Sequence, residues 1–129
     1  MKRIVYRSTI AAAVDSTEVF NIIDTSNRRN PARGITGFLL HDGERFLQFL
    51  EGPPLEVEGL LAEIERDPRH TDLVIVYDEG AQEPWFPDWA MKRLINFTGP
   101  PAIDQLREEL AGKPDGDRVL GLVEDFLRA

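Results

Sequence analysis

The stretch GITGFLLHDGERFLQFLE, residues 34–51, decides the fold of this 129-residue chain. Its centre, Asp42-Gly43, is a typical hairpin turn, so segments 34–41 and 45–51 are expected to pair as antiparallel strands. Side chains of a strand alternate between its two faces. In the second strand Phe46, Gln48 and Leu50 share one face, and Leu47 and Phe49 share the other. A strand that is apolar on both faces needs cover on both faces.

Turn and capping signals divide the rest of the sequence into strands and helices. We expect a strand over Arg3–Ser8, a helix from its N-cap Asp15 to about Arg29, a helix from Pro53-Pro54 to Asp67-Pro68, and strands over Leu73–Tyr77 and Trp89–Leu94. This order, βαββαβ plus one strand, predicts an α+β, ferredoxin-like fold with two helices on one face of the sheet.

The second face of the sheet needs a cover of its own. After the breaker Thr98-Gly99-Pro100-Pro101, apolar residues recur at helical spacing in two stripes. The stripes are Ile103, Leu106 and Leu110, followed by Val119, Leu120, Val123, Phe126 and Leu127. We therefore expect two short C-terminal helices to cap this face. Residues 1–97 would form the ligand-binding domain and residues 98–129 its helical cap, with no separate output domain.

Composition limits the classes of function. The formal net charge is 15 − 23 = −8, which disfavours a nucleic-acid partner because that binding relies on basic side chains. The sequence has neither an apolar run of about 18 residues that could span a membrane nor the apolar core of a signal peptide, so we expect a cytoplasmic protein. Cysteine is absent, and His41 and His70 are too isolated to indicate a metal site.

Three polar side chains are predicted in apolar surroundings. Gln48 lies between two inward-facing apolar residues, Tyr6 also faces inward, and Asn30 ends the buried stripe of the first helix. Burying an unpaired amide is costly, so these groups suggest a small-molecule pocket between sheet and helices. Simpler interpretations stay open, since a buried tyrosine is often structural and an asparagine before proline can cap a helix. The pattern predicts a pocket without naming its ligand.

At these residues the sequence resembles the BLUF family, the sensors of blue light using FAD. Five segments match in order, over about residues 2–93: Val5-Tyr6-Arg7-Ser8, Asn30 with Ile35-Thr36-Gly37, Phe46–Pro53 with the pattern FxQxxEG, Asp67-Pro68-Arg69-His70, and Phe86-Pro87-Asp88-Trp89-Ala90-Met91. The ITG segment alone is a weak signal, but five collinear motifs make the resemblance specific.

The resemblance implies non-covalent binding of FAD, or of FMN or riboflavin in its place, between the two helices and the sheet. The ring would be lined by Ile22, Ser26, Leu39, Phe46, Leu50 and Ile64, and Asn30 would hydrogen-bond its carbonyl edge. Asp67, Arg69 and His70 would lie by the ribityl and phosphate end, where a cation is favourable. The same segment is also an ordinary polar turn.

The resemblance also implies a photoreceptor that is not an enzyme. Tyr6 would pass an electron and a proton to the excited flavin, and Gln48 would rotate or tautomerise. Trp89 or Met91 would lie next to that glutamine and pass the change onward. The expected partners are the flavin, an unidentified downstream protein and further copies of the chain in a homodimer or higher oligomer, without nucleic acid or membrane.

Two alternatives share the predicted fold. A light-independent ligand-binding regulatory domain would have the same pocket and lack the flavin. An acylphosphatase-like hydrolase would need a phosphate-binding loop after the first strand, with a catalytic arginine inside it. Residues 8–14 have no glycine, and the nearest arginine is Arg7, so this enzyme class is disfavoured.

Overall fold

The computed structural model describes residues 1–11, 15–41, 44–87, 92–95 and 100–128. Its strands are β1 (Lys2–Ile10), β2 (Thr36–His41), β3 (Arg45–Gly52), β4 (His70–Gly80) and β5 (Lys92–Ile95). Its helices are α1 (Ser16–Arg29), the short 3-10 helix η1 (Pro31–Arg33), α2 (Pro54–Arg66), α3 (Pro100–Leu110) and α4 (Gly116–Arg128). Within the described residues, no helix is long and apolar enough to cross a membrane.

The strands form one sheet in the order β4-β1-β3-β2-β5. Pairing is antiparallel except between β2 and β5, which run parallel. The predicted α+β, ferredoxin-like arrangement with an extra strand is therefore confirmed. The register places Gln48 opposite Tyr6 of β1 and opposite Leu39 of β2, so these three side chains project from the middle of the sheet.

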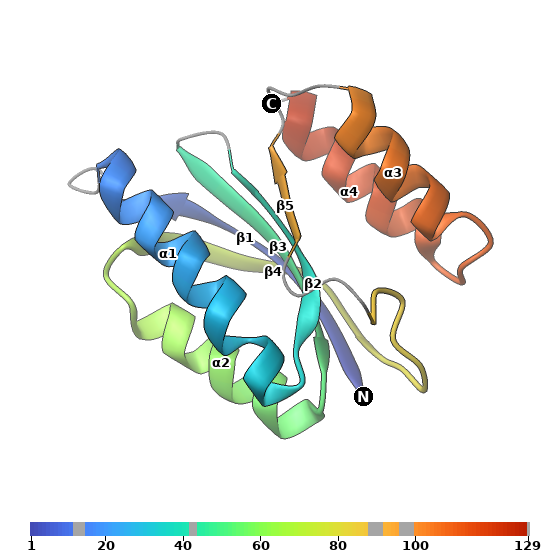
Figure 1. The fold of residues 1–129 in the computed structure, drawn as a ribbon, viewed down its shortest axis with the longest axis horizontal. Coiled ribbons are helices and arrows are strands. Elements are labelled where there is room, and N and C mark those ends of the chain that lie inside the picture. The colour runs from blue at the N-terminus through green and yellow to red at the C-terminus, as the bar shows by residue number, and fades with distance from the viewer. Residues whose placement is uncertain (12–14, 42–43, 88–91, 96–99, 129) are drawn as a thin grey trace.

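Helices cover both faces of the sheet, α1 and α2 on one and α3 and α4 on the other (Figure 1). The face under α1 and α2, called here the near face, contains Ile4, Tyr6, Leu39, Phe46 and Leu50. The far face joins the other side chains of the same strands, Val5, Phe38, Leu40, Leu47 and Phe49, to Leu106, Leu110, Val119, Val123 and Phe126. The alternation in residues 34–51 thus predicted both layers and the helical cap correctly.

Aromatic side chains dominate the centre of the far face. The Phe49 ring stacks on Phe38 with centroids 5.2 Å apart, and on Trp85 at 5.8 Å. The Phe86 ring meets the Phe38 and Phe49 rings edge-on, at 5.6 and 5.1 Å. Since stacked and edge-on contacts are the favourable geometries for aromatic pairs, this layer is densely and specifically packed.

A buried carboxylate ties the segment before β5 to the far face. Glu51, which is 1% exposed, accepts hydrogen bonds from the backbone N–H of Trp85 at 2.8 Å and of Phe86 at 2.6 Å. The Arg3 Nε also donates to Glu51, at 3.2 Å, and the Arg3 guanidinium lies 4.0 Å from the centre of the Trp85 ring. Three donors therefore compensate the buried charge, as such a group requires.

Close backbone contacts require glycine at two positions of the matched motifs, Gly37 of ITG and Gly52 of FxQxxEG. At Gly37, φ is +145°, and a Cβ atom would lie 1.9 Å from the carbonyl oxygen of Phe49. At Gly52, a Cβ atom would lie 2.7 Å from the carbonyl oxygen of Gly34. A side chain at Gly37 would force β2 away from β3, and one at Gly52 would force the end of β3 away from residues 34–35. These close contacts explain why both positions hold glycine.

Element boundaries differ from expectation mainly in β4. The apolar pattern predicted residues 73–77, whereas the strand extends from His70 to Gly80. Its ends pair with β1, so pairing with a neighbour extends the strand beyond its own apolar residues. The predicted last strand began at Trp89, but β5 is described from Lys92, and residues 88–91 lie outside the described part of the chain.

Candidate functional site

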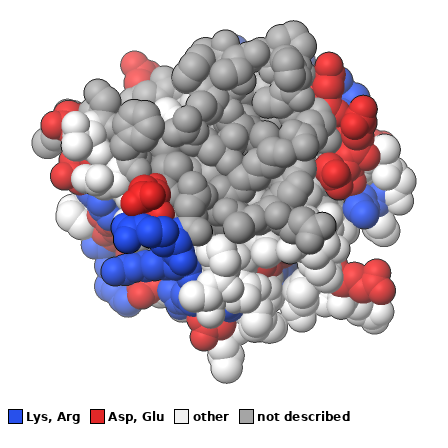
Figure 2. Space-filling model, viewed as in Figure 1, with Lys and Arg blue, Asp and Glu red and all other residues white. Residues whose placement is uncertain are grey.

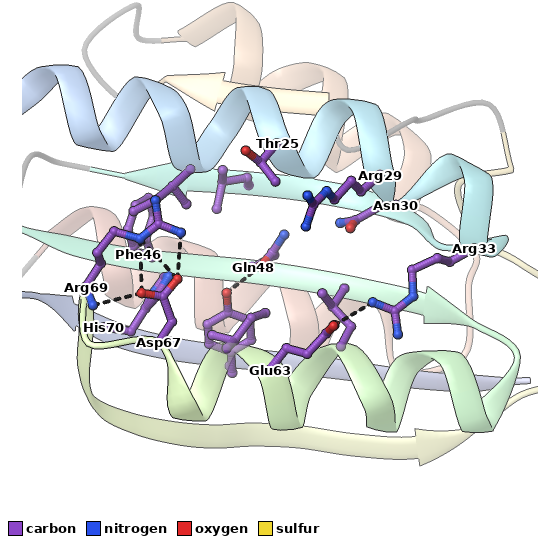
Figure 3. Close-up of a pocket in the computed structure, with 15 residues that line it drawn as sticks. Thr25, Arg29, Asn30, Arg33, Phe46, Gln48, Glu63, Asp67, Arg69 and His70 are labelled. Carbon is purple, nitrogen blue, oxygen red and sulfur yellow. Dashed lines mark hydrogen bonds and ion pairs between the residues drawn. The ribbon is translucent and has the colours of Figure 1, made fainter.

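A cavity of about 170 Å³ lies on the near face, between α1, α2 and the sheet (Figure 3). Its walls are the apolar side chains of Ile22, Leu39, Phe46, Leu60 and Ile64. Tyr6, Asn30 and Gln48 add neutral polar groups, and charged side chains lie toward both ends. Apolar walls with a few polar groups are the usual composition of a small-molecule site.

The sheet side of the cavity holds a buried tyrosine–glutamine pair. The Tyr6 hydroxyl donates a short hydrogen bond to Gln48 Oε1, and both residues are at most 2% exposed. Burial raises the pKa of Tyr6 far above its usual range, and the negative charge of Asp67 adds to this effect. The phenol therefore keeps its proton at neutral pH. The amide nitrogen of Gln48 points to the opposite side, toward α1 (Figure 3).

Asn30 contributes a buried amide whose nitrogen lacks a partner. The residue is 1% exposed and lines the cavity, and its Nδ2 makes no hydrogen bond within the described residues. Its backbone carbonyl accepts from the N–H groups of Arg33 and Ile35, but its side chain makes no capping hydrogen bond to η1. An unsatisfied buried donor costs about 1–3 kcal/mol, so Asn30 indicates a missing acceptor in the cavity.

At one end of the cavity Arg69 is held by acidic side chains. Its Nη2 lies 2.6 Å from Asp67 Oδ2, and its Nη1 lies 3.6 Å from Glu18 Oε2. Hydrogen bonding by Arg69 lowers the pKa of Asp67, which therefore stays ionised at neutral pH. His70 hydrogen-bonds Ser8 through Nδ1 at 3.0 Å and packs on the Phe46 ring. Burial lowers the pKa of His70 and favours its neutral form.

At the other end a second arginine fastens η1 to α2. Arg33 lies 2.7 Å from Glu56 Oε2 and 2.6 Å from Glu63 Oε2. The hydrogen bond from Arg33 lowers the pKa of Glu63 and keeps it ionised. Arg29 and Thr25, one turn apart on α1, complete this side of the lining (Figure 3).

The structure gathers most of the sequence-predicted site residues around this cavity. Its lining includes Ile22, Asn30, Leu39, Phe46, Gln48, Ile64, Asp67, Arg69 and His70. Leu50 is buried in the same apolar cluster without lining the cavity. Ser26 lies in α1, but its side chain is outside the described part of the chain, as are Trp89 and Met91 entirely. Whether these residues contact a flavin stays a prediction.

Sequence reasoning did not single out five of the lining residues, Thr25, Arg29, Arg33, Leu60 and Glu63. On α1, Thr25 follows Ile22 by three residues and Arg29 follows Thr25 by four, so helical periodicity could have included both. Arg33 and Glu63 are far apart in sequence, and no local pattern predicts their ion pair.

Comparisons with known proteins match this geometry. The family model described as sensors of blue light using FAD, BLUF, matches residues 1–92. Photoactivated adenylate cyclase subunit beta of Euglena gracilis is 36% identical over 107 residues, which is 80% of this chain and 12% of that relative. The chain thus spans about an eighth of the length of this curated relative.

Two solved structures also resemble the whole chain. The dark-state structure of BlrB, a BLUF protein, is 30% identical with a TM-score of 0.72, covering 95% of this chain and 93% of that one. Klebsiella pneumoniae BlrP1 with FMN and cyclic diGMP is 29% identical with a TM-score of 0.80, covering 98% of this chain and 34% of that one.

Proposed function

Because the chain belongs to the BLUF family of sensors of blue light using FAD, we propose that it is a blue-light photoreceptor holding FAD non-covalently in the near-face cavity. The observation that carries this proposal is the buried hydrogen bond from Tyr6 to Gln48 beside that cavity. FMN or riboflavin would occupy the same place if FAD were not supplied.

The lining residues fit a flavin. Ile22, Leu39, Phe46 and Ile64 offer apolar surfaces to a flat aromatic ring system. The partnerless Nδ2 of Asn30 offers a donor to a ring carbonyl, which would remove the cost of burying that amide. These features support a ligand that is aromatic on its faces and carries hydrogen-bond acceptors at its edge.

Tyr6 is the proposed electron and proton donor. A bound flavin supplies the absorption of blue light and the capacity to accept an electron and a proton. Tyr6 can provide both, because its ring is oxidisable and its raised pKa keeps the phenol protonated in the dark. Because the Tyr6 hydroxyl donates its hydrogen bond to Gln48, the proton would leave toward the Gln48 amide beside the cavity.

Gln48 is the proposed switch. A primary amide has a donor end and an acceptor end, so rotation or tautomerisation exchanges the two without a permanent product. In the described geometry its oxygen faces Tyr6, and reversal would present a donor there instead. A neutral hydrogen bond contributes only about 1 kcal/mol net, which suits a state that reverts in the dark.

The output is proposed to be a protein contact and not a reaction catalysed by this chain. The flavin-binding part would be residues 1–97, with residues 98–129 as its cap. Trp89 or Met91 would pass the change in Gln48 toward α3 and α4, whose surface would meet a downstream protein in the cytoplasm. A homodimer or higher oligomer is proposed as the working assembly.

The test uses two substitutions with different chemistry. Tyr6→Phe keeps the ring and removes the hydroxyl, while Gln48→Leu removes both ends of the amide. We expect both variants to bind flavin but to lose the light-induced red shift of the flavin absorption band. The measurement is the absorption spectrum before and after blue light, followed back to its starting shape in darkness.

The wild type serves as the control, because it should show the full reversible shift. A full shift in Tyr6→Phe would contradict the assignment of the photoswitch, even with flavin bound. A wild type that stays colourless after flavin is supplied would contradict the proposed function itself.

A further inference from the structure

Two of the three arginines that line the cavity are already paired with carboxylates. Arg33 contacts Glu56 and Glu63 at 2.7 and 2.6 Å. Arg69 contacts Asp67 at 2.6 Å and Glu18 at 3.6 Å. An incoming anion would have to compete with these carboxylates for either guanidinium. Neither arginine is therefore the favoured contact for a negatively charged part of a ligand.

Arg29 differs from both. It is exposed at the end of α1, and within the described residues it makes no direct hydrogen bond or ion pair, although its charge helps to lower the pKa of Glu63. Its neighbour Arg28 is also exposed but pairs with Asp24 at 3.1 Å. Figure 3 shows the Arg29 guanidinium next to Asn30 on the α1 side of the cavity. Consecutive residues thus present a buried neutral amide inside the cavity and a cation at its rim.

The local charge around the mouth suits an anion better than the net charge of −8 suggests. On the face shown in Figure 2, Lys and Arg side chains gather on the side of the molecule where α1 and α2 lie. Glu63 also lines the cavity, but its charge is compensated by Arg33. A phosphate at the rim would therefore meet Arg29, the one lining arginine that no carboxylate of the described residues contacts within ion-pair distance, although the charge of Glu63 acts on it from farther away.

We propose that Arg29 recognises the phosphate of a bound flavin nucleotide and so sets the preference for FMN or FAD over riboflavin. This inference rests on the proposed function and assigns to Arg29 the role that the sequence suggested for Arg69. A guanidinium suits a phosphate because its donors can form two parallel charge-assisted hydrogen bonds. Asn30 would hold the uncharged ring, which all three flavins share.

The experiment measures the affinity of flavin-free protein for riboflavin, FMN and FAD by quenching of flavin fluorescence. In Arg29→Gln, the dissociation constants for FMN and FAD should rise about tenfold, as for loss of a charged hydrogen bond, while that for riboflavin stays unchanged. Arg28→Gln is the matched control, with the same charge change one residue away, and should leave all three affinities unchanged. Arg29→Lys should recover part of the preference.

Three outcomes would overturn the role of Arg29. They are an unchanged ratio of FMN to riboflavin affinity in Arg29→Gln, an equal loss of affinity for all three flavins, and the same loss in Arg28→Gln. A shift of the preference by Arg69→Gln alone would return the role to Arg69. Failure of the wild type to bind any of the three flavins would contradict the proposed function instead, so the two failures are distinguishable.

Discussion

The two faces of the sheet differ in how tightly their side chains pack. On the far face, the Phe38, Phe49, Trp85 and Phe86 rings contact one another directly. On the near face, α1 and α2 leave a cavity of about 170 Å³ over the same strands. Adjacent residues of β3 therefore have different surroundings: one side chain packs in the aromatic layer of the far face, and the next lies on the face that holds the cavity.

Buried polar groups show the same contrast. Glu51, on the far face, has donors from Arg3, Trp85 and Phe86 around its carboxylate. Asn30, on the near face, has a buried amide nitrogen without a partner among the described residues. Because unsatisfied buried groups cost free energy, the comparison teaches that, within the described residues, the polypeptide itself satisfies the buried carboxylate of the far face, whereas the buried amide of the near face is left for a ligand to satisfy.

Removing the cover of the far face should have the largest effect. A chain truncated after Phe97 lacks α3 and α4, so Val5, Phe38 and Phe49 lose their cover. An exposed apolar patch of this kind promotes aggregation, and we expect precipitation or large oligomers in size-exclusion chromatography. Deletion of residues 128 and 129 alone is the control and should elute as the wild type does. A truncated protein that is monodisperse and equally stable would contradict the claim that the far face needs α3 and α4 as its cover.

A matched pair of substitutions on β3 compares the faces directly. Phe49→Ala empties the aromatic layer and should lower the free energy of unfolding of the flavin-free protein by about 3–5 kcal/mol. Phe46→Ala removes an equally buried ring that borders the cavity, so fewer contacts are lost and the decrease should be smaller. Urea unfolding of both variants measures the difference. Equal losses would mean that the two faces are equally well packed.

Substitution of Asn30 should have the smallest effect on stability, and it tests whether the near face needs a ligand. In flavin-free protein, Asn30→Ala removes an unpaired donor and should change the free energy of unfolding by less than about 1 kcal/mol. Flavin affinity should fall by about 1–3 kcal/mol, because a buried ring carbonyl loses its donor. Asn21→Ala, at an exposed position of α1, is the control for both measurements. An unchanged affinity and spectrum in Asn30→Ala would remove Asn30 from the site.

The sequence predicted the parts of this contrast that depend on alternation. Phe46 and Leu47, adjacent on β3, were expected on opposite faces, and the C-terminal stripes were expected to close the second face. Tyr6 and Gln48 were expected to converge, because both lie on inward-facing positions of strands in a small sheet. Their direct hydrogen bond depends on the register between β1 and β3, which alternation does not determine.

Long-range pairing of charges was beyond sequence reasoning. Glu51 accepts hydrogen bonds from Trp85 and Phe86, which follow it by 34 and 35 residues, after α2 and β4, in a segment that no helix or strand pattern places. The sequence also did not indicate which of the adjacent Arg28 and Arg29 has a direct ion pair among the described residues, because this depends on the side of α1 from which each projects. The place of Arg69 near a phosphate stays a prediction; its ion pair with Asp67, two residues earlier in the same turn, was not predicted.

The position of β1 in the sheet has a consequence for synthesis on the ribosome. Although β1 precedes the other four strands of the sheet along the chain, it lies between β3 and β4, so neither of its edges is paired until residues 45–52 and 70–80 have followed. Contacts so distant in sequence slow folding, because the loop must close before any pairing is gained. The nascent sheet then presents its aromatic side until residues 100–128 emerge. During that interval the exposed apolar surface favours aggregation of the unfinished chain.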